Sequence, residues 1–257
     1  MATRTIDLNC DMGESFGAWT MGQDEAVLPH VSSVNVACGF HAGDPDVMLR
    51  TVRAAHARGV AIGAHVSLPD LQGFGRREMK VSADEVYALT AYQVGALAGI
   101  ARAVGASLNH VKAHGALYNQ LARDAALARA HAQAVRDAAP GLVLYALAGS
   151  VALREARTLG VATAGEAFAD RRYDADGSLA PRRDADAVIH DPETAAAQLV
   201  AIVDTGKVFA RDGSVVAIDA QTICVHGDRA DAAAFARTLR ARLDACGVVV
   251  RAVRGAA

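Results

Sequence analysis

The chain repeats one design, in which a segment with the pattern of a β-strand runs into a titratable residue and a helical pattern follows. In the first example, residues 5–14, apolar and polar positions alternate before the segment reaches Asp11 and Glu14. The later examples end at His41, His65, His114, Glu166 and His226. Parallel strands joined by helices place their carboxyl ends at one edge, so the repeats predict a β/α barrel with a single polar mouth. One such residue would more often be structural, but six strand ends of this kind favour a functional site.

The number of strand–helix units determines the kind of barrel that we expect. We count seven units, which favours a distorted seven-stranded parallel β/α barrel over a regular eightfold one. The 257 residues suffice for one large α/β domain and no linker divides them, so we expect a single domain over residues 1–257. Two polar excursions, near residues 66–81 and 168–187, are expected to fold over the mouth as lids.

The composition excludes several classes of protein. The net charge is −2 and acidic and basic residues are interspersed, so the chain lacks the basic stripe of a nucleic-acid-binding protein. No apolar run is long enough to span a bilayer, and we expect no signal peptide. The four cysteines show no Cys-x-x-Cys spacing, and we expect reduced thiols in a cytoplasmic protein.

Short sequence signals indicate where individual elements begin. Asp-Pro pairs at 44–45 and 191–192 predict helix starts with an Asp cap and Pro in the first turn. A Ser-x-x-Glu pattern at 82–85 predicts a capping box. The strand end at 148–150, Ala-Gly-Ser, carries no strong acid or base. We therefore expect it to serve only the barrel wall or backbone contacts to a ligand.

Seven short segments surround the predicted strand ends. In chain order they are DLNCDMGE at 7–14, ACGFHAGD at 37–44, GAH at 63–65, GFGRR at 73–77, VKAHG at 111–115, FADR at 168–171 and CVHGD at 224–228. Together they resemble the signature of the LamB/YcsF family, the A-type subunits of 5-oxoprolinase, over residues 5–250. Val66 and Ala113 stand where the family usually has Pro. These differences concern the backbone beside His65 and His114 and leave their side-chain chemistry unchanged.

The resemblance implies a barrel related to polysaccharide deacetylases and an activity, the ATP-dependent opening of 5-oxo-L-proline (pyroglutamate) to L-glutamate. It also implies a complex with two partners, the B-type and C-type 5-oxoprolinase subunits. Phosphorylation of the lactam oxygen would give an activated species that water can attack. The chain has no Gly-x-x-x-x-Gly-Lys-Ser/Thr loop, since residues 39–43 lack the Lys and the hydroxyl. We therefore expect the partners largely to handle ATP, the co-substrate, and this barrel to bind the lactam and open the ring.

Two pairs of carboxylates are candidates for the proton transfers of ring opening. Water must lose a proton as it attacks, and the ring nitrogen must gain one as it leaves. Asp11 and Glu14 are expected to supply the base and an orienting carboxylate, although both could instead stand at the start of a helix. Glu166 and Asp170 form the second pair, in which Asp170 could equally make a structural salt bridge to Arg171.

Three histidines from separate strand ends could bind a divalent metal. By analogy with metal-dependent deacetylases, Asp11, His65 and His114 would be the ligands, and His41 is a further catalytic candidate. Alternatively, the histidines bind substrate through hydrogen bonds or act as acid and base without a metal.

The remaining candidates are one further catalytic residue, Lys112, and a set expected to bind the substrate. Lys112 alternates with apolar neighbours and should point into the barrel, where it could hold a substrate carboxylate or a phosphoryl oxygen. A buried ion pair of Lys112 with Asp7 or Glu166 is the alternative. The other substrate-binding candidates are Asn9, Arg76, Arg171, His226 and Asp228. His226 and Asp228 could form a His–carboxylate pair, or Asp228 could only cap the last helix.

Two other hypotheses compete with an ATP-dependent enzyme subunit. One is a stand-alone metal-dependent amidase or carbohydrate N-deacetylase, which would bind its metal tightly and act without ATP. The other is a non-catalytic scaffold that binds 5-oxoproline for its partners and would tolerate changes of Asp11 or His65. The many ionisable groups at strand ends exceed what binding alone requires, which weighs against the scaffold.

Overall fold

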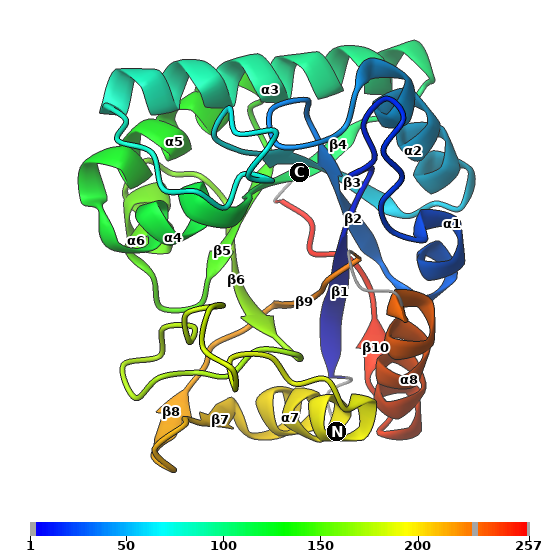
Figure 1. Cartoon of the computed structure of the whole chain (residues 1–257), viewed down its shortest axis with the longest axis vertical. Helices are drawn as coiled ribbons and strands as arrows, with labels where there is room; N and C mark the ends of the chain where they lie inside the picture. Colours follow the sequence, from blue (N-terminus) through cyan, green and yellow to red (C-terminus); the bar gives the residue numbers. More distant parts are fainter. Residues whose placement is uncertain (1–3, 228–230, 256–257) are drawn as a thin grey trace.

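The computed structural model describes residues 4–227 and 231–255 and shows a closed parallel barrel (Figure 1). Seven strands follow one another in the order β1–β2–β3–β4–β5–β6–β9, and β9 pairs with β1 to close the barrel. These strands are β1 (Thr5–Met12), β2 (Ser33–Ala37), β3 (Ala61–Val66), β4 (Leu108–Ala113), β5 (Val143–Leu147), β6 (Thr163–Phe168) and β9 (Thr222–Val225). The predicted seven-stranded parallel barrel is confirmed.

Helices surround the barrel on its outside (Figure 1). They are α1 (Asp24–Val27), a short 3₁₀ helix (Leu28–His30), α2 (Pro45–Ala57), α3 (Ala83–Ala103), α4 (Gly115–Arg123), α5 (Ala125–Ala138), α6 (Val151–Thr158), α7 (Pro192–Thr205) and α8 (Ala232–Ala245). The helix starts predicted at 44–45, 82–85 and 191–192 are confirmed. At each of them, the cap side chain accepts a hydrogen bond from the first turn of the helix, which satisfies a backbone N–H that has no partner within the helix.

Three short strands lie outside the closed barrel. Strands β7 (Lys207–Phe209) and β8 (Val215–Ala217) form an antiparallel hairpin. Strand β10 (Val249–Val250) pairs in parallel with Thr5 and Ile6 at the start of β1. Within the described ranges, no helix combines the length and apolar character needed to cross a membrane.

The barrel interior is filled with polar side chains. Along β1, Asp7, Asn9 and Asp11 are buried and bond to residues of other strands across the interior, while the apolar positions between them join the hydrophobic core. The Asp7 carboxylate accepts hydrogen bonds from Ser33 and Thr222. Because a buried polar group without a partner is costly, these bonds favour the placement of β2 and β9 on either side of β1. The network continues along the interior to the carboxyl ends of the strands.

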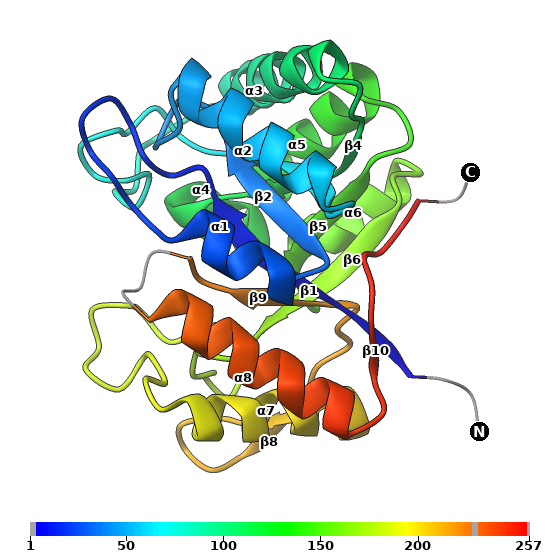
Figure 2. The ribbon, with the colours of Figure 1, turned by 90° about the vertical axis from the view of Figure 1, so that its right-hand side faces the viewer.

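The long connections gather at the carboxyl ends of the strands. Figure 2 shows the blue loop after β1, the cyan loop after β3 and the yellow-green segment after β6 on the same side of the molecule. The loop after β3 is attached to the start of α4, since the Ala116 N–H donates to the carbonyl oxygen of Gly75 at 2.8 Å. These connections surround the entrance to the barrel.

Candidate active site

An open cavity of about 830 Å³ lies at this entrance. The predicted site residues that line it are Asp11, His65, Arg76, Lys112, His114, Arg171 and His226. Residues 176–183 and Arg76 bring both excursions to the cavity wall, and movement of these segments as lids stays a prediction. Glu14, His41, Glu166 and Asp170 are buried close to these lining residues and contact them directly.

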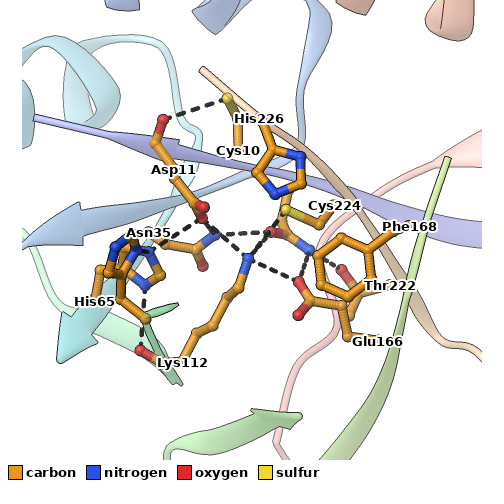
Figure 3. A network of polar contacts seen from close by, with 12 residues as sticks. Cys10, Asp11, Asn35, His65, Lys112, Glu166, Phe168, Thr222, Cys224 and His226 are labelled. Atoms are coloured by element: carbon orange, nitrogen blue, oxygen red, sulfur yellow. Dashed lines mark hydrogen bonds and ion pairs between the residues drawn. The ribbon is translucent and has the colours of Figure 1, made fainter. Parts of the chain in front are cut away.

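Lys112 is at the centre of the polar network beneath the cavity (Figure 3). Its Nζ lies 3.0 Å from Asp11 Oδ1, 2.9 Å from Glu166 Oε1 and 3.0 Å from Cys224 Sγ. Burial alone would lower the pKa of Lys112, but Asp11, Cys224 and Glu166 raise it well above its usual value. The predicted ion pair with Glu166 is present, whereas Asp7 bonds to hydroxyl groups at the other end of the interior. Lys112 is therefore a fixed cation between two carboxylates.

Asp11 is held on the opposite side of Lys112 from Glu166. Its Oδ1 accepts a hydrogen bond from Asn35 Nδ2 at 2.8 Å and lies 3.4 Å from His65 Nε2. Burial raises the pKa of Asp11, but His65 and Lys112 outweigh this effect and hold it well below its usual value. The carboxylate is thus ionised, fixed in orientation and weakly basic.

Three imidazoles and one carboxylate form a buried cluster beside Asp11. His65 Nε2 lies 3.0 Å from His114 Nδ1, and the rings of His41 and His114 are stacked with centroids 3.9 Å apart. Glu14 Oε1 lies 3.5 Å from His41 Nε2 and 3.9 Å from His114 Nδ1. Burial, together with the neighbouring histidines, lowers the pKa of His41 and of His114 well below the usual value. Both rings are therefore neutral near pH 7.

The hydrogen bonds around this cluster fix the orientation of His114. Its Nε2 lies 2.8 Å from the carbonyl oxygen of Phe74, and because a carbonyl oxygen only accepts, this nitrogen carries the proton. When the ring is neutral, His114 Nδ1 therefore presents a lone pair to His65 Nε2, 3.0 Å away, and His65 Nε2 also lies 3.4 Å from Asp11 Oδ1. Among the described residues, neither nitrogen of His41 has a hydrogen-bond partner.

These donors fit a divalent metal ion. Ligand atoms of Glu14, His41, His65 and His114 all lie within 4.8 Å of one another, and nitrogen and carboxylate oxygen are ordinary zinc ligands. The expected ligand set of Asp11, His65 and His114 shares its two histidines with this group, and Asp11 Oδ1 lies 3.4 Å from His65 Nε2. Asp11 also forms a second candidate group with Cys224 and His226, and the part of Asp11 as a ligand stays a prediction.

The second predicted carboxylate pair divides between two places. Glu166 lies inside β6 and contacts Lys112, whereas Asp170 follows the strand and lies 2.8 Å from His226 Nδ1. Burial raises the pKa of Asp170, but His226 and the nearby Arg182 hold it below its usual value. The carboxylate that orients His226 is therefore Asp170. The proposed partner Asp228 lies outside the described residues.

The predicted anion-binding and amide groups have different environments. Arg76 is exposed at the cavity and its guanidinium lies over the Phe74 ring, 4.9 Å from the centroid. Arg171 is buried and donates to the carbonyl oxygens of Ala180 and Ala187, so it stabilises the fold of the segment after β6. Arg171 also helps to hold the pKa of Asp170 below its usual value, and the alternative of a structural salt bridge between these two residues stays a prediction.

Asn9 lies deeper than the cavity. Its amide donates to Glu166 Oε1 at 2.9 Å and to Thr222 Oγ1 at 2.7 Å, and its oxygen accepts from Asn35 at 2.7 Å. Its described contacts therefore support the interior network, and direct contact of Asn9 with a substrate stays a prediction.

Two residues of the site were not predicted. Asn35 links Asp11 to Asn9, and its Oδ1 accepts a hydrogen bond from His110 Nε2 at 2.7 Å. Its signal in the sequence is a lone amide between valines in a strand. Tyr118, at the start of α4, lines the cavity, and burial together with Glu166 raises its pKa well above the usual value. A single tyrosine in an amphipathic helix gives no sequence signal for such a place.

Comparison with known proteins places this site in a family. The model of the LamB/YcsF family matches residues 6–257. The chain is 59% identical over 247 residues to a protein named as the A subunit of 5-oxoprolinase from Bordetella pertussis, covering 96% of this chain and 98% of that protein. It is 55% identical over 251 residues to a protein of the same name from Geobacillus kaustophilus, covering 98% of each.

Two solved structures extend the comparison. A lactam utilization protein from Thermus thermophilus superposes with a TM-score of 0.92 at 49% identity, covering 97% of this chain and all of that one. A family 4 carbohydrate esterase from Streptomyces lividans has a TM-score of 0.52 at 12% identity over 99% of this chain and 97% of that one, so it shares the fold only. The chain belongs to the LamB/YcsF family, whose members include the A-type subunits of 5-oxoprolinase.

Proposed function

We propose that this protein is the component of an ATP-dependent 5-oxoprolinase that binds the lactam and opens its ring to L-glutamate. Two partner subunits, of the B and C types, would supply the phosphoryl group of ATP. The names of relatives at 55–59% identity support the substrate and the assembly into a complex. The observation that carries the proposal is the buried group of Glu14, His41, His65 and His114 beside Asp11 and Lys112 at the cavity. The four free cysteines fit a reducing compartment, and we propose the cytoplasm.

The reaction needs activation because an amide carbon resists attack by water. Phosphorylation of the lactam oxygen makes the ring carbon electrophilic. Attack by water, protonation of the ring nitrogen and cleavage of the C–N bond then give an acyl phosphate. A second water molecule hydrolyses it to glutamate and inorganic phosphate. The barrel must therefore accept a proton from water and return one to nitrogen.

The described residues divide these tasks according to their basicity. Glu14 lies beside the imidazoles of His41 and His114, which are neutral, so we assign acceptance of the proton and its return to nitrogen to this carboxylate. Asp11 is too weakly basic for that task and instead orients His65. Lys112 holds the carboxylates of Asp11 and Glu166 in place beneath the cavity. A divalent ion held by the four cluster residues would supply Lewis acidity toward the lactam or phosphoryl oxygen.

Two alternatives make different predictions. A stand-alone metal-dependent amidase or N-deacetylase is favoured by the clustered ligand atoms of Glu14 and the three histidines, and it would act without ATP. A 5-oxoproline-binding scaffold would keep the complex active when Asp11 or His65 is changed.

Glutamate release from 5-oxoproline tests the proposal. The chain would be assayed alone and with both partner subunits, with and without ATP, and its metal content would be measured on the same sample. We expect release only in the full mixture with ATP. ATP-dependent release by the chain alone would refute the division of labour, and ATP-independent hydrolysis of an amide with bound zinc would favour the amidase.

A further inference from the structure

The turn between β5 and α6 opens directly onto the cavity. Ala148, Gly149, Ser150 and Val151 all line it, and Gly149 has a φ of +79°, a conformation that favours glycine. The sequence predicted only a wall or backbone contacts at this strand end because it carries no acid or base. The structure adds a helix start at the cavity.

Ser150 occupies the N-cap position of α6 and yet does not cap the helix. Its side chain makes no hydrogen bond to the helix backbone. The residue is only 7% exposed, and within the described part of the chain its hydroxyl has no hydrogen-bond partner. A buried hydroxyl without a partner is costly, so its place beside an open polar cavity indicates that a ligand supplies the missing contact.

The same helix start offers further donors to an anion. The first backbone N–H groups of a helix have no acceptor within it, and the helix dipole makes this end positive. Arg154 lies one turn along α6, lines the cavity, and places Nη1 3.4 Å from the carbonyl oxygen of Gly149. Arg76 and Arg183 line the same cavity. This concentration of donors and positive charge favours an anion over a neutral ligand.

We propose that Ser150, the first N–H groups of α6 and Arg154 form a subsite for a phosphoryl group. A hydroxyl, backbone N–H groups and a guanidinium on one side of the cavity match the three terminal oxygens of a phosphate monoester. A carboxylate has only two oxygens and would use fewer of these donors than a phosphate. If the proposed function holds, the natural source is the phosphorylated lactam, and inorganic phosphate is the other source. The subsite would then hold the activated substrate by its phosphoryl group in the same cavity as the histidine cluster.

Inorganic phosphate is the probe for the subsite itself. The intact chain would be titrated by calorimetry in the wild type and in Ser150→Ala, Arg154→Ala and Arg157→Ala. Arg157 is the matched control, because it lies in the last turn of the same helix. We expect Arg154→Ala to weaken phosphate binding about tenfold or more, Ser150→Ala about three- to tenfold, and Arg157→Ala to leave it unchanged.

Thermal unfolding of the same variants separates binding from capping. Because Ser150 makes no cap bond and its buried hydroxyl has no hydrogen-bond partner among the described residues, we expect Ser150→Ala to keep the unfolding midpoint of the wild type or to raise it. Unchanged phosphate binding in Ser150→Ala and Arg154→Ala, or a lowered midpoint as the only effect of Ser150→Ala, would overturn the proposal.

The source of the phosphoryl group is tested in the reconstituted complex. If the phosphorylated lactam uses the subsite, Arg154→Ala lowers the glutamate formed per ATP cleaved. If the site holds only free phosphate, that ratio stays constant while inhibition by added phosphate is lost. Phosphate binding by the isolated chain does not depend on turnover, so an inactive complex would refute the proposed function and leave the subsite standing.

Discussion

Replacing Lys112 with Met tests whether the charge balance of the barrel interior rests on this residue. Met preserves most of the side-chain volume and removes the cation, which leaves the carboxylates of Asp11 and Glu166 buried without it. Each lies within 3.0 Å of Nζ, and both residues are at least nine-tenths buried. Removing one partner of a buried ion pair typically costs about 3–5 kcal/mol, because the remaining charge loses its compensation.

The expected loss is large for a protein of this size. Typical free energies of unfolding are about 5–15 kcal/mol, and for chains of about 150–250 residues each kcal/mol corresponds to roughly 2–4 °C. Lys112→Met should therefore lower the unfolding midpoint by about 6–20 °C. Urea titration at pH 7 measures the free energy, and calorimetry measures the midpoint.

A second substitution distinguishes lost charge from lost packing. In Lys112→Met with Glu166→Gln, one of the two stranded charges is gone, so we expect about 1–3 kcal/mol to be recovered relative to Lys112→Met alone. If Lys112→Met unfolds within about 1 kcal/mol of the wild type, or if the double variant is no more stable than the single one, our account of the interior is wrong.

Three further predictions concern pH, packing and metal. Burial lowers the pKa of His131 from 6.5 to about 4, so the unfolded chain binds the proton at a higher pH than the folded chain, and stability falls as the pH drops through this range. Between pH 7 and pH 5, the free energy of unfolding, measured with urea, should fall by about 2 kcal/mol less in His131→Gln than in the wild type, and equal falls would contradict this. A Cβ at Gly63 would lie 2.1 Å from His110 Nε2, so Gly63→Ala should destabilise the protein by about 1–3 kcal/mol, and an unchanged stability would refute the packing at this position. Gly95→Ala is the control: nothing described lies within 4 Å of its new Cβ, so stability should rise by up to about 1 kcal/mol. Zinc at a hundredfold excess over its Kd should stabilise the wild type by about 2.7 kcal/mol and His41→Ala much less, and equal shifts would argue against the histidine cluster as the site.

Local signals in the sequence were sufficient for the fold. The Asp-Pro and Ser-x-x-Glu starts depend only on neighbours in the chain, and the seven strand–helix units determine a closed parallel barrel. Strand ends gathered at one mouth also followed from the topology, since parallel strands all point the same way.

Pairings across the mouth could not be predicted from the sequence. The carboxylate beside His226 is Asp170, 56 residues away, because the register of β6 and β9 and the turn after β6 bring them together. The other residue expected beside His226, Asp228, lies outside the described residues. Similarly, Glu14 joins His41 because Gly13 turns the chain after β1, with a φ of +70°. The sequence gives no signal for Ser150, since the feature that distinguishes it is a buried hydroxyl without a hydrogen-bond partner among the described residues.

The most direct test of the central claim measures glutamate released and ATP cleaved by the complex assembled with Glu14→Gln. If the ring opens in this barrel, glutamate release should fall by about 10²- to 10⁴-fold while the partners still cleave ATP. Glu25→Gln, an exposed change in α1, should leave both rates at the wild-type level. Full glutamate release by Glu14→Gln would contradict the account and point to a scaffold that binds the lactam for its partners.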